Sequence, residues 1–324
     1  MGGTGSSTVD IFDRDVKRAH RERAVRLQTS EDPLQAEVAE RLLDRLEDCK
    51  RTFPRVAVLG GAGEAVVSRL CGGRAGIESA VLLDSSNAML ERCRQRVSQQ
   101  SASTGPPGLS NLKVEYVEGE EDALPLKERS MDLIVSCLGL HWVNDLPGAM
   151  IQCQKALKPD GLFLGAMFGG DTLQELRIAH GLAEQEVEGG ISPRISPLAQ
   201  VRDAGNLLTR ANLAIPSVDT DEIIVNYRSM DELVRHLRAM GESNAVRVRR
   251  PLMRLATARR AAEIYAEKFG TEDGALPATY QIIFMTGWAP HASQQRPMQR
   301  GSAEVTLESL QAELAKRKAS NPKA

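Results

Sequence analysis

The segment RVAVLGGAGE (residues 55–64) decides the fold. It begins with a short apolar run, passes into glycines, and ends where a helical pattern starts at Glu64. Because glycine has no Cβ, Gly60, Gly61 and Gly63 allow backbone amides to approach a bound molecule closely. A strand, a glycine loop and a helix in this order predict the first unit of a nucleotide-binding α/β domain. Taken alone, the same glycines could also form nothing more than a tight turn.

Short apolar runs continue to alternate with helical stretches, which predicts a mainly parallel sheet covered by helices on both faces. With the first strand, the expected strands number seven, and the last two follow helical insertions. Those after the first cover residues 79–84, 112–119, 131–136, 162–168, 221–227 and 279–288. Helices are expected at 64–70, 87–97, 197–212 and 258–269, and a surface loop at 98–110.

Capping patterns predict three further helix starts. Asp145 precedes a helix with Pro147 in its first turn. Two pairs, Thr172 with Glu175 and Ser229 with Glu232, have the spacing of capping boxes.

We divide the chain into four parts on these grounds. Residues 1–50 form an N-terminal helical segment or lid, and 51–170 a Rossmann-like cofactor-binding core. Residues 171–300 complete the same domain with helical insertions and the last two strands, and 301–324 form a tail.

Composition excludes several classes of protein. Forty-one basic and 43 acidic residues give a net charge of −2, so no overall field favours nucleic acid or anionic lipid. The five cysteines form no C-x-x-C pair, which argues against structural zinc and for a reducing compartment. No apolar run approaches the ~20 residues of a membrane span. The first residues resemble neither a secretory signal nor an intact transit peptide.

Asp84 ends the second expected strand, where a carboxylate can accept hydrogen bonds from both hydroxyls of a ribose. It could instead cap the helix that follows. Together with the glycine loop, Asp84 predicts a nucleoside site, and Ala62, Ser85 and Leu138 are expected to line it.

The segment after the third strand narrows the cofactor. GEEDALP (residues 119–125) resembles the segment with which S-adenosylmethionine-dependent methyltransferases face the adenine. In that resemblance Glu120 stands at the acidic position and the backbone around Glu121 meets the adenine edge. The expected fold is therefore α/β, the Rossmann-like, seven-stranded methyltransferase fold. A solvated acidic loop is the structural alternative, and a nicotinamide dehydrogenase is the second choice for the cofactor.

The glycine loop departs from the methyltransferase pattern at Val58, Ala62 and Glu64. Val58 cannot accept a hydrogen bond from the methionine amino group. Glu64 adds negative charge near a helix N-terminus that would otherwise favour the methionine carboxylate. We therefore expect weak binding of S-adenosylmethionine.

Longer strings outside these motifs carry a more specific signal. They include FDRDVKR (12–18), LHWVNDLPGA (140–149), GAMFGGDTLQELR (165–177), EGGISPRISP (188–197), MGESNA (240–245) and PATYQIIFMTGW (277–288). These strings resemble the methyltransferase-like assembly factors of mitochondrial respiratory complex I. The resemblance implies a matrix protein, peripheral to the inner membrane, that hydroxylates an arginine on an iron–sulfur subunit of the complex. A more distant similarity is to the methyl ester methyltransferases of biotin synthesis.

Arginine hydroxylation needs an oxidant and groups that hold a guanidinium. His141, Asp171 and Glu242 are the candidate catalytic residues, with Trp142 beside them. The alternatives are that His141 is structural, Trp142 a core aromatic, and Asp171 a helix cap. The spacing of the histidines predicts no iron site, so the oxidant stays open; they are His20, His141, His180, His236 and His291.

Two other functions stay open at this point. One is S-adenosylmethionine-dependent methyl transfer to a small acid or a protein. The other is a non-catalytic assembly chaperone.

Overall fold

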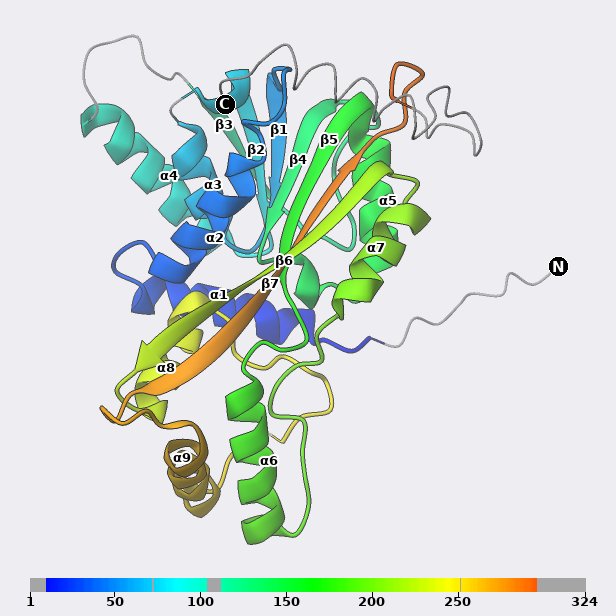
Figure 1. The fold of residues 1–324 in the computed structure, drawn as a ribbon. Coiled ribbons are helices and arrows are strands. Elements are labelled where there is room, and N and C mark those ends of the chain that lie inside the picture. The colour runs from blue at the N-terminus through cyan, green and yellow to red at the C-terminus, as the bar shows by residue number, and fades with distance from the viewer. Residues whose placement is uncertain (1–9, 72, 104–111, 251, 296–324) are drawn as a thin grey trace, which may run out of the picture. The chain divides into compact units, whose positions relative to one another are not determined.

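The computed structural model describes residues 10–71, 73–103, 112–250 and 252–295. Its centre is a seven-stranded sheet with the order β3-β2-β1-β4-β5-β7-β6 (Figure 1). β7 runs antiparallel to β5 and β6, and the other strand pairs of the described residues are parallel. The expected fold is confirmed. The strands are β1 (Arg55–Leu59), β2 (Ser79–Asp84), β3 (Lys113–Glu118), β4 (Met131–Cys137), β5 (Leu157–Phe168), β6 (Ala214–Tyr227) and β7 (Leu276–Trp288).

Helices cover both faces of the sheet, as the apolar strands require. Val56 and Val58 of β1 pack on the face that carries α2 (Pro33–Asp44), α3 (Gly63–Leu70) and α4 (Asn87–Ser103). The alternating residues Ala57 and Leu59 pack on the opposite face, beneath α5 (Leu146–Ala156) and α7 (Val201–Arg210). The core is therefore continuous on each side of the sheet.

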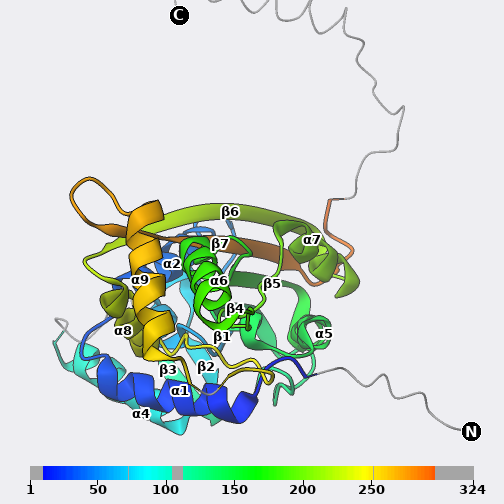
Figure 2. The ribbon, with the colours of Figure 1, turned by 90° about the horizontal axis from the view of Figure 1, so that it is seen from below.

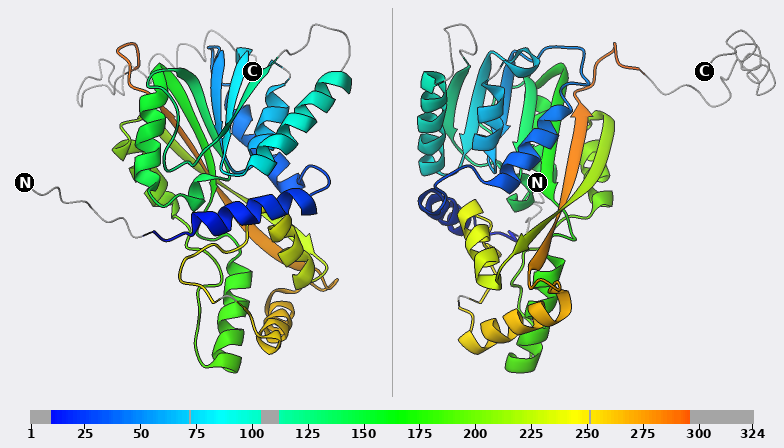
Figure 3. Two further views of the ribbon diagram at one scale, coloured as in Figure 1. Left: turned by 180° about the vertical axis from the view of Figure 1, so that it is seen from behind. Right: turned by 60° about the vertical axis from the view of Figure 1, so that its left-hand side comes forward.

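The remaining helices gather beyond the carboxyl ends of the parallel strands (Figures 1 and 3). Here β6 and β7 extend beyond the ends of the parallel strands and contact α6 (Gln174–Glu188), α8 (Met230–Met240) and α9 (Leu255–Phe269). Helix α1 (Arg14–Leu27) lies across the strand ends, as Figure 2 shows from below. Within the described ranges, two short 3₁₀ turns complete the elements, η1 (Arg74–Gly76) and η2 (Leu140–Trp142).

Two of the three predicted helix starts hold. Asp145 accepts a hydrogen bond from the Gly148 amide at 2.9 Å, at the start of α5. Ser229 caps α8 by accepting from the Glu232 amide at 3.2 Å. The Glu232 carboxylate, however, accepts from the Arg228 amide rather than from Ser229.

The capping box at Thr172 and Glu175 is wrong. Helix α6 begins at Gln174, and its N-cap residue is Leu173 in the left-handed conformation. The Thr172 hydroxyl donates to the Gln281 carbonyl at 3.0 Å, and Glu175 accepts from the Thr279 amide at 3.2 Å. Both side chains are buried against β7, so this strand supplies the partners that a helix end would otherwise provide.

Helix α4 and strand β6 are longer than the sequence predicted, the first because of helix propensity and the second because of strand pairing. Helix α4 continues through residues 98–103, because no glycine or proline interrupts it before Gly105. The rest of the expected loop lies outside the described residues, as does the tail 301–324. Strand β6 starts at Ala214 because it pairs along the whole of β7. In the described part of the chain, no helix combines the length and apolarity that a membrane crossing requires.

Candidate cofactor and substrate site

The glycine loop is the most constrained turn of the site. Gly60 and Gly61 have φ of +43° and +56°, in the left-handed region. A Cβ on Gly61 would lie 2.1 Å from the Cys137 carbonyl oxygen, and one on Gly60 would lie 2.0 Å from Glu121 Oε1. The Ala62 amide donates to the same Cys137 carbonyl at 2.7 Å. The loop therefore closes against β4 and the Glu121 segment with room for backbone only.

Asp84 lies at the end of β2, as predicted, but helix α1 occupies its carboxylate. Arg21 donates through Nε to Oδ1 at 3.0 Å and through Nη2 to Oδ2. The same guanidinium donates to the Gly61 carbonyl at 3.0 Å. The side chains of Arg21 and Asp84 are 7% and 4% exposed. The two oxygens expected to bind a ribose are thus paired with an internal cation, and Ser85 is buried beside them.

The acidic segment after β3 is also paired with α1. Arg14 donates through Nε to Glu120 at 2.8 Å and also binds Glu121. Burial raises the pKa of Glu120, and Arg14 opposes that rise. The segment expected to face an adenine therefore faces a guanidinium in this structure.

Two of the three residues at which the loop departs from the methyltransferase pattern, Val58 and Glu64, have different surroundings. Val58 is fully buried in the sheet, with no carboxylate in its place. Glu64 pairs with Arg92 at 2.6 Å and also with Arg96, so its negative charge is compensated. Val58 is the more serious departure from the methyltransferase pattern.

Little space is left between α1 and the glycine loop. The cavity there measures about 10 Å³. The glycine cradle and Asp84 fit a nucleoside chemically, but one can enter only after α1 withdraws. The lining residues are Arg14, Lys17, Arg21, Gly61, Ser85, Glu121, Leu138, Gly139 and Trp142.

Another cation of α1, Lys17, lies in a buried cage. Its Nζ is 2.9 Å from Glu242 Oε1, donates to the Gly241 carbonyl at 2.8 Å, and lies 3.9 Å from the Trp142 ring centroid. The other Glu242 oxygen, Oε2, lies 3.0 Å from His141 Nε2 and accepts from Trp142 Nε1 at 2.8 Å. Glu242 is therefore fixed from both sides.

The burial of Lys17 and Glu242 beside each other shifts the pKa values of both groups. Burial lowers the pKa of Lys17 to about 8, although Glu242 opposes the shift. Burial alone would raise the pKa of Glu242, but Lys17 and His141 outweigh it and hold that pKa well below its usual range. Glu242 is a carboxylate at neutral pH.

The predicted catalytic residues separate into two groups. His141 and Glu242 are in contact, and both lie at a larger cavity. Asp171 is exposed, accepts a hydrogen bond from Gln281 Nε2 at 2.9 Å, and does not line that cavity. Trp142 is buried against Phe12, with ring centroids 5.2 Å apart, so it packs in the core and also covers Lys17.

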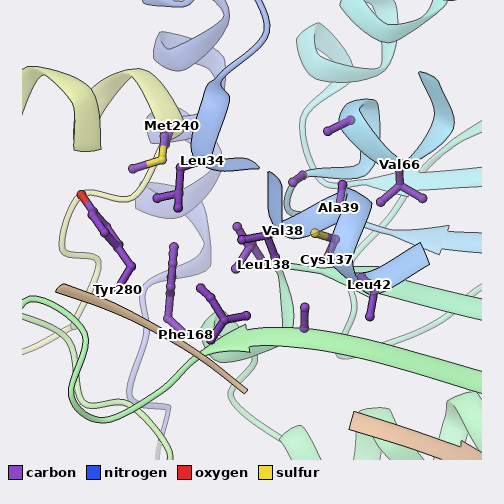
Figure 4. Packing of buried hydrophobic residues seen from close by; sticks show 14 of the residues in the cluster. Leu34, Val38, Ala39, Leu42, Val66, Cys137, Leu138, Phe168, Met240 and Tyr280 are labelled. Atoms are coloured by element: carbon purple, nitrogen blue, oxygen red, sulfur yellow. The ribbon is translucent and has the colours of Figure 1, made fainter. Parts of the chain in front are cut away.

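The larger cavity has a volume of about 360 Å³ and lies among η2, α6, α8 and the loop after α8. Phe168 and Tyr280 form an aromatic part of its wall, with ring centroids 5.8 Å apart. Figure 4 shows them in one apolar cluster with Leu138. Four arginines also line the cavity, namely Arg194, Arg238, Arg249 and Arg250.

Three histidines from separate elements line this cavity as well: His20, His141 and His180. Each has a buried Nδ1 without a hydrogen-bond partner. Burial lowers the pKa of both His20 and His180 to about 4, so these two rings are neutral at neutral pH. They offer polar contacts to a ligand without adding charge.

Comparison with known proteins places these features in a family. Residues 59–165 match the family model described as a methyltransferase domain. The chain is 45% identical over 312 residues to "Arginine-hydroxylase NDUFAF5, mitochondrial" of Homo sapiens, covering 95% of this chain and 86% of that protein. The Danio rerio protein of the same name is 43% identical, over 93% of this chain and 90% of its own length. The chain belongs to the arginine-hydroxylase NDUFAF5 family.

Two further similarities are more distant. A malonyl-[acyl-carrier protein] O-methyltransferase of Xylella fastidiosa is 34% identical, over 79% of this chain and 81% of that protein. The solved structure of the YcgJ protein of Bacillus subtilis has a TM-score of 0.52 at 14% identity, covering 78% of this chain and 99% of that one. This structure shares the fold alone.

The sequence predicted a helical segment or lid within residues 1–50, but not that the cations of α1 pair with the carboxylates of the site in this NDUFAF5-family chain. Arg14, Lys17 and Arg21 recur at helical spacing, so they share one face of α1. Each cation on that face pairs with carboxylates far along the chain. Arg14 pairs with Glu120 and Glu121, Lys17 pairs with Glu242, and Arg21 pairs with Asp84. The basic stripe was visible in the sequence, but nothing local indicated what it would contact.

Proposed function

We propose that this chain hydroxylates an arginine side chain on an iron–sulfur subunit of respiratory complex I during its assembly. It would act in the mitochondrial matrix, peripheral to the inner membrane. The names of the relatives support the reaction type. The observation that carries the proposal is Glu242, a buried carboxylate that already holds a cation against an indole face.

That arrangement suits the chemistry of the acceptor. A guanidinium is planar and cationic, and it binds through carboxylates, carbonyl oxygens and aromatic faces. Glu242, the Gly241 carbonyl and Trp142 supply one of each. These groups bind and orient the substrate, while the aromatic wall of the cavity excludes water. The oxygen atom must come from an oxidant, which this chain's described residues do not identify.

The cofactor we propose is weakly bound S-adenosylmethionine. Its site would comprise Gly60, Gly61, Ala62, Asp84, Ser85, Glu120, Glu121 and Leu138. The match to a methyltransferase domain and the glycine cradle support this assignment. Weak binding follows from Val58 and from the Arg21–Asp84 pair, which has to open first. Calorimetry tests it, and affinity equal to that of ordinary methyltransferases would overturn the expectation of weak binding.

One observation favours a second function, methyl transfer to a carboxylate. The larger cavity is lined by four arginines, and Nη2 of Arg194 is buried without a hydrogen-bond partner. A relative is named as a methyltransferase that acts on a malonyl group. This function predicts release of S-adenosylhomocysteine in the presence of a free acid acceptor.

The test of the main proposal is mass spectrometry of complex I subunits from cells that lack the protein. We expect an arginine to lose the mass of one oxygen atom and to regain it when the wild-type chain is restored. An unmodified arginine in wild-type cells, or one unaffected by the loss, would reject the proposal. Restored assembly with no arginine oxidation would indicate a chaperone instead.

A further inference from the structure

Lys17 is an unusual residue to bury. Its side chain is 4% exposed, yet it forms no part of the sheet core and reaches its cage from a helix outside the sheet. Burying an ammonium group is costly unless its surroundings replace its water shell. Here a carboxylate, a carbonyl and an indole face replace it. The cage is therefore built to hold a cation.

We propose that Glu242, Trp142 and the Gly241 carbonyl form the binding site for the substrate guanidinium, and that Lys17 occupies it as an internal stand-in. This inference rests on the proposed arginine hydroxylase function and specifies its acceptor site. The substrate arginine replaces Lys17 when α1 withdraws.

The contacts of Glu242 support such an exchange. Its Oε2 is held by His141 at 3.0 Å and by Trp142 at 2.8 Å, and neither contact involves Lys17. The orientation of the carboxylate therefore does not depend on Lys17. Its Oε1 pairs with Lys17 at 2.9 Å and becomes available once that side chain leaves.

A substrate side chain has a route to this position. Glu242, His141 and Trp142 line the 360 Å³ cavity as well as contacting one another. Phe168 and Tyr280 supply an apolar wall along which the methylene groups of an arginine can pack. An arginine entering this cavity would meet Glu242 in its wall.

The same helix controls both ligands. Lys17 pairs with Glu242. Arg21, four residues further along α1, pairs with Asp84, the predicted ribose ligand. Because both cations lie on one face of α1, one displacement of the helix frees both carboxylates. Occupation of one site then favours binding at the other.

A binding experiment on the full chain tests the site directly. The probes are N-acetylarginine methylamide and its neutral isostere N-acetylcitrulline methylamide, titrated by calorimetry. Lys17→Met should bind the arginine probe about tenfold or more tightly than wild type, because it removes the competing cation. It should not gain affinity for citrulline, and adding Glu242→Gln should abolish the gain. No gain in Lys17→Met, an equal gain for citrulline, or a gain that survives Glu242→Gln would overturn the proposal.

A second variant covers the case in which Lys17→Met does not fold. Lys17→Arg places a guanidinium in the cage from the helix itself. We expect Lys17→Arg to melt close to the wild-type temperature, and a loss of stability as large as that of Lys17→Met, whether that variant melts lower or fails to fold, would overturn the proposal. Arginine binding without oxidation of a complex I subunit would reject the proposed function alone. Oxidation of the subunit without arginine binding by Lys17→Met would reject this site alone.

Discussion

Arg21 and Asp84, 63 positions apart in the chain, form a buried pair in which one guanidinium engages both carboxylate oxygens. The pair closes α1 over the strand ends. It also occupies the carboxylate that the sequence predicts as the ribose ligand.

Replacing Arg21 with glutamine should tighten the binding of S-adenosylmethionine about tenfold, because it releases Asp84. The same change should lower the free energy of unfolding by about 3 kcal/mol, because it leaves a buried carboxylate without its partner. Calorimetry and urea denaturation measure the two effects. Arg26→Gln, at an exposed position of the same helix, is the matched control and should change neither. Unchanged or weaker cofactor binding in Arg21→Gln would show that the pair does not compete with the cofactor.

The glycine loop gives a second prediction. Gly61→Ala should lower the free energy of unfolding by about 3 kcal/mol or more, since a Cβ would lie 2.1 Å from backbone at Cys137 and φ is +56°. Gly73→Ala is the control, because φ is +74° but no atom lies within 4 Å of its Cβ position. That variant should lose only about 1 kcal/mol from backbone strain. Equal losses in thermal or urea unfolding would mean that the close approach at Gly61 relaxes without cost.

The sequence predicted the fold and the floor of the site because both depend on local pattern. Apolar runs of strand length specify the sheet, and the glycines before Glu64 specify the turn. Asp84 was placed at the correct strand end for the same reason. These features need no knowledge of what lies above them.

The side chains of α1 that fill the site could not be predicted from local pattern. Lys17 reads as one charge on a polar helix, and only the tertiary arrangement brings it to Glu242, 225 positions later. Thr172 and Glu175 failed as a capping box for the same reason, since β7 supplies their partners. Asp171 remains an untested prediction, placed by the structure outside the cavity.

Glu242 and Asp171 can be compared by isosteric substitution. Glu242→Gln should reduce arginine modification by about a hundredfold or more, because it removes the carboxylate that holds the cation. Asp171→Asn should have a smaller effect, since Asp171 is exposed and bonded to Gln281. Quantitative mass spectrometry of the restored subunit measures both, with thermal unfolding to confirm that each variant folds. Full activity in Asp171→Asn would remove it from the site, and full activity in Glu242→Gln would remove Glu242.

The buried histidines make the free energy of unfolding depend on pH. Burial and the nearby Arg194 lower the pKa of His180 to about 4, below the ordinary value of 6.5, so the unfolded chain takes up this proton first. Stability from this residue is therefore complete above pH 6.5 and is lost as pH falls toward 4. The loss should be roughly 2 kcal/mol, discounted for incomplete burial. Urea denaturation of His180→Gln between pH 4 and 6.5 should show a flatter dependence than wild type, whereas His291→Gln, at an exposed position, should retain the wild-type slope. Identical slopes in wild type and His180→Gln would mean that His180 takes up its proton equally in the folded and unfolded chain, so that burial does not lower its pKa.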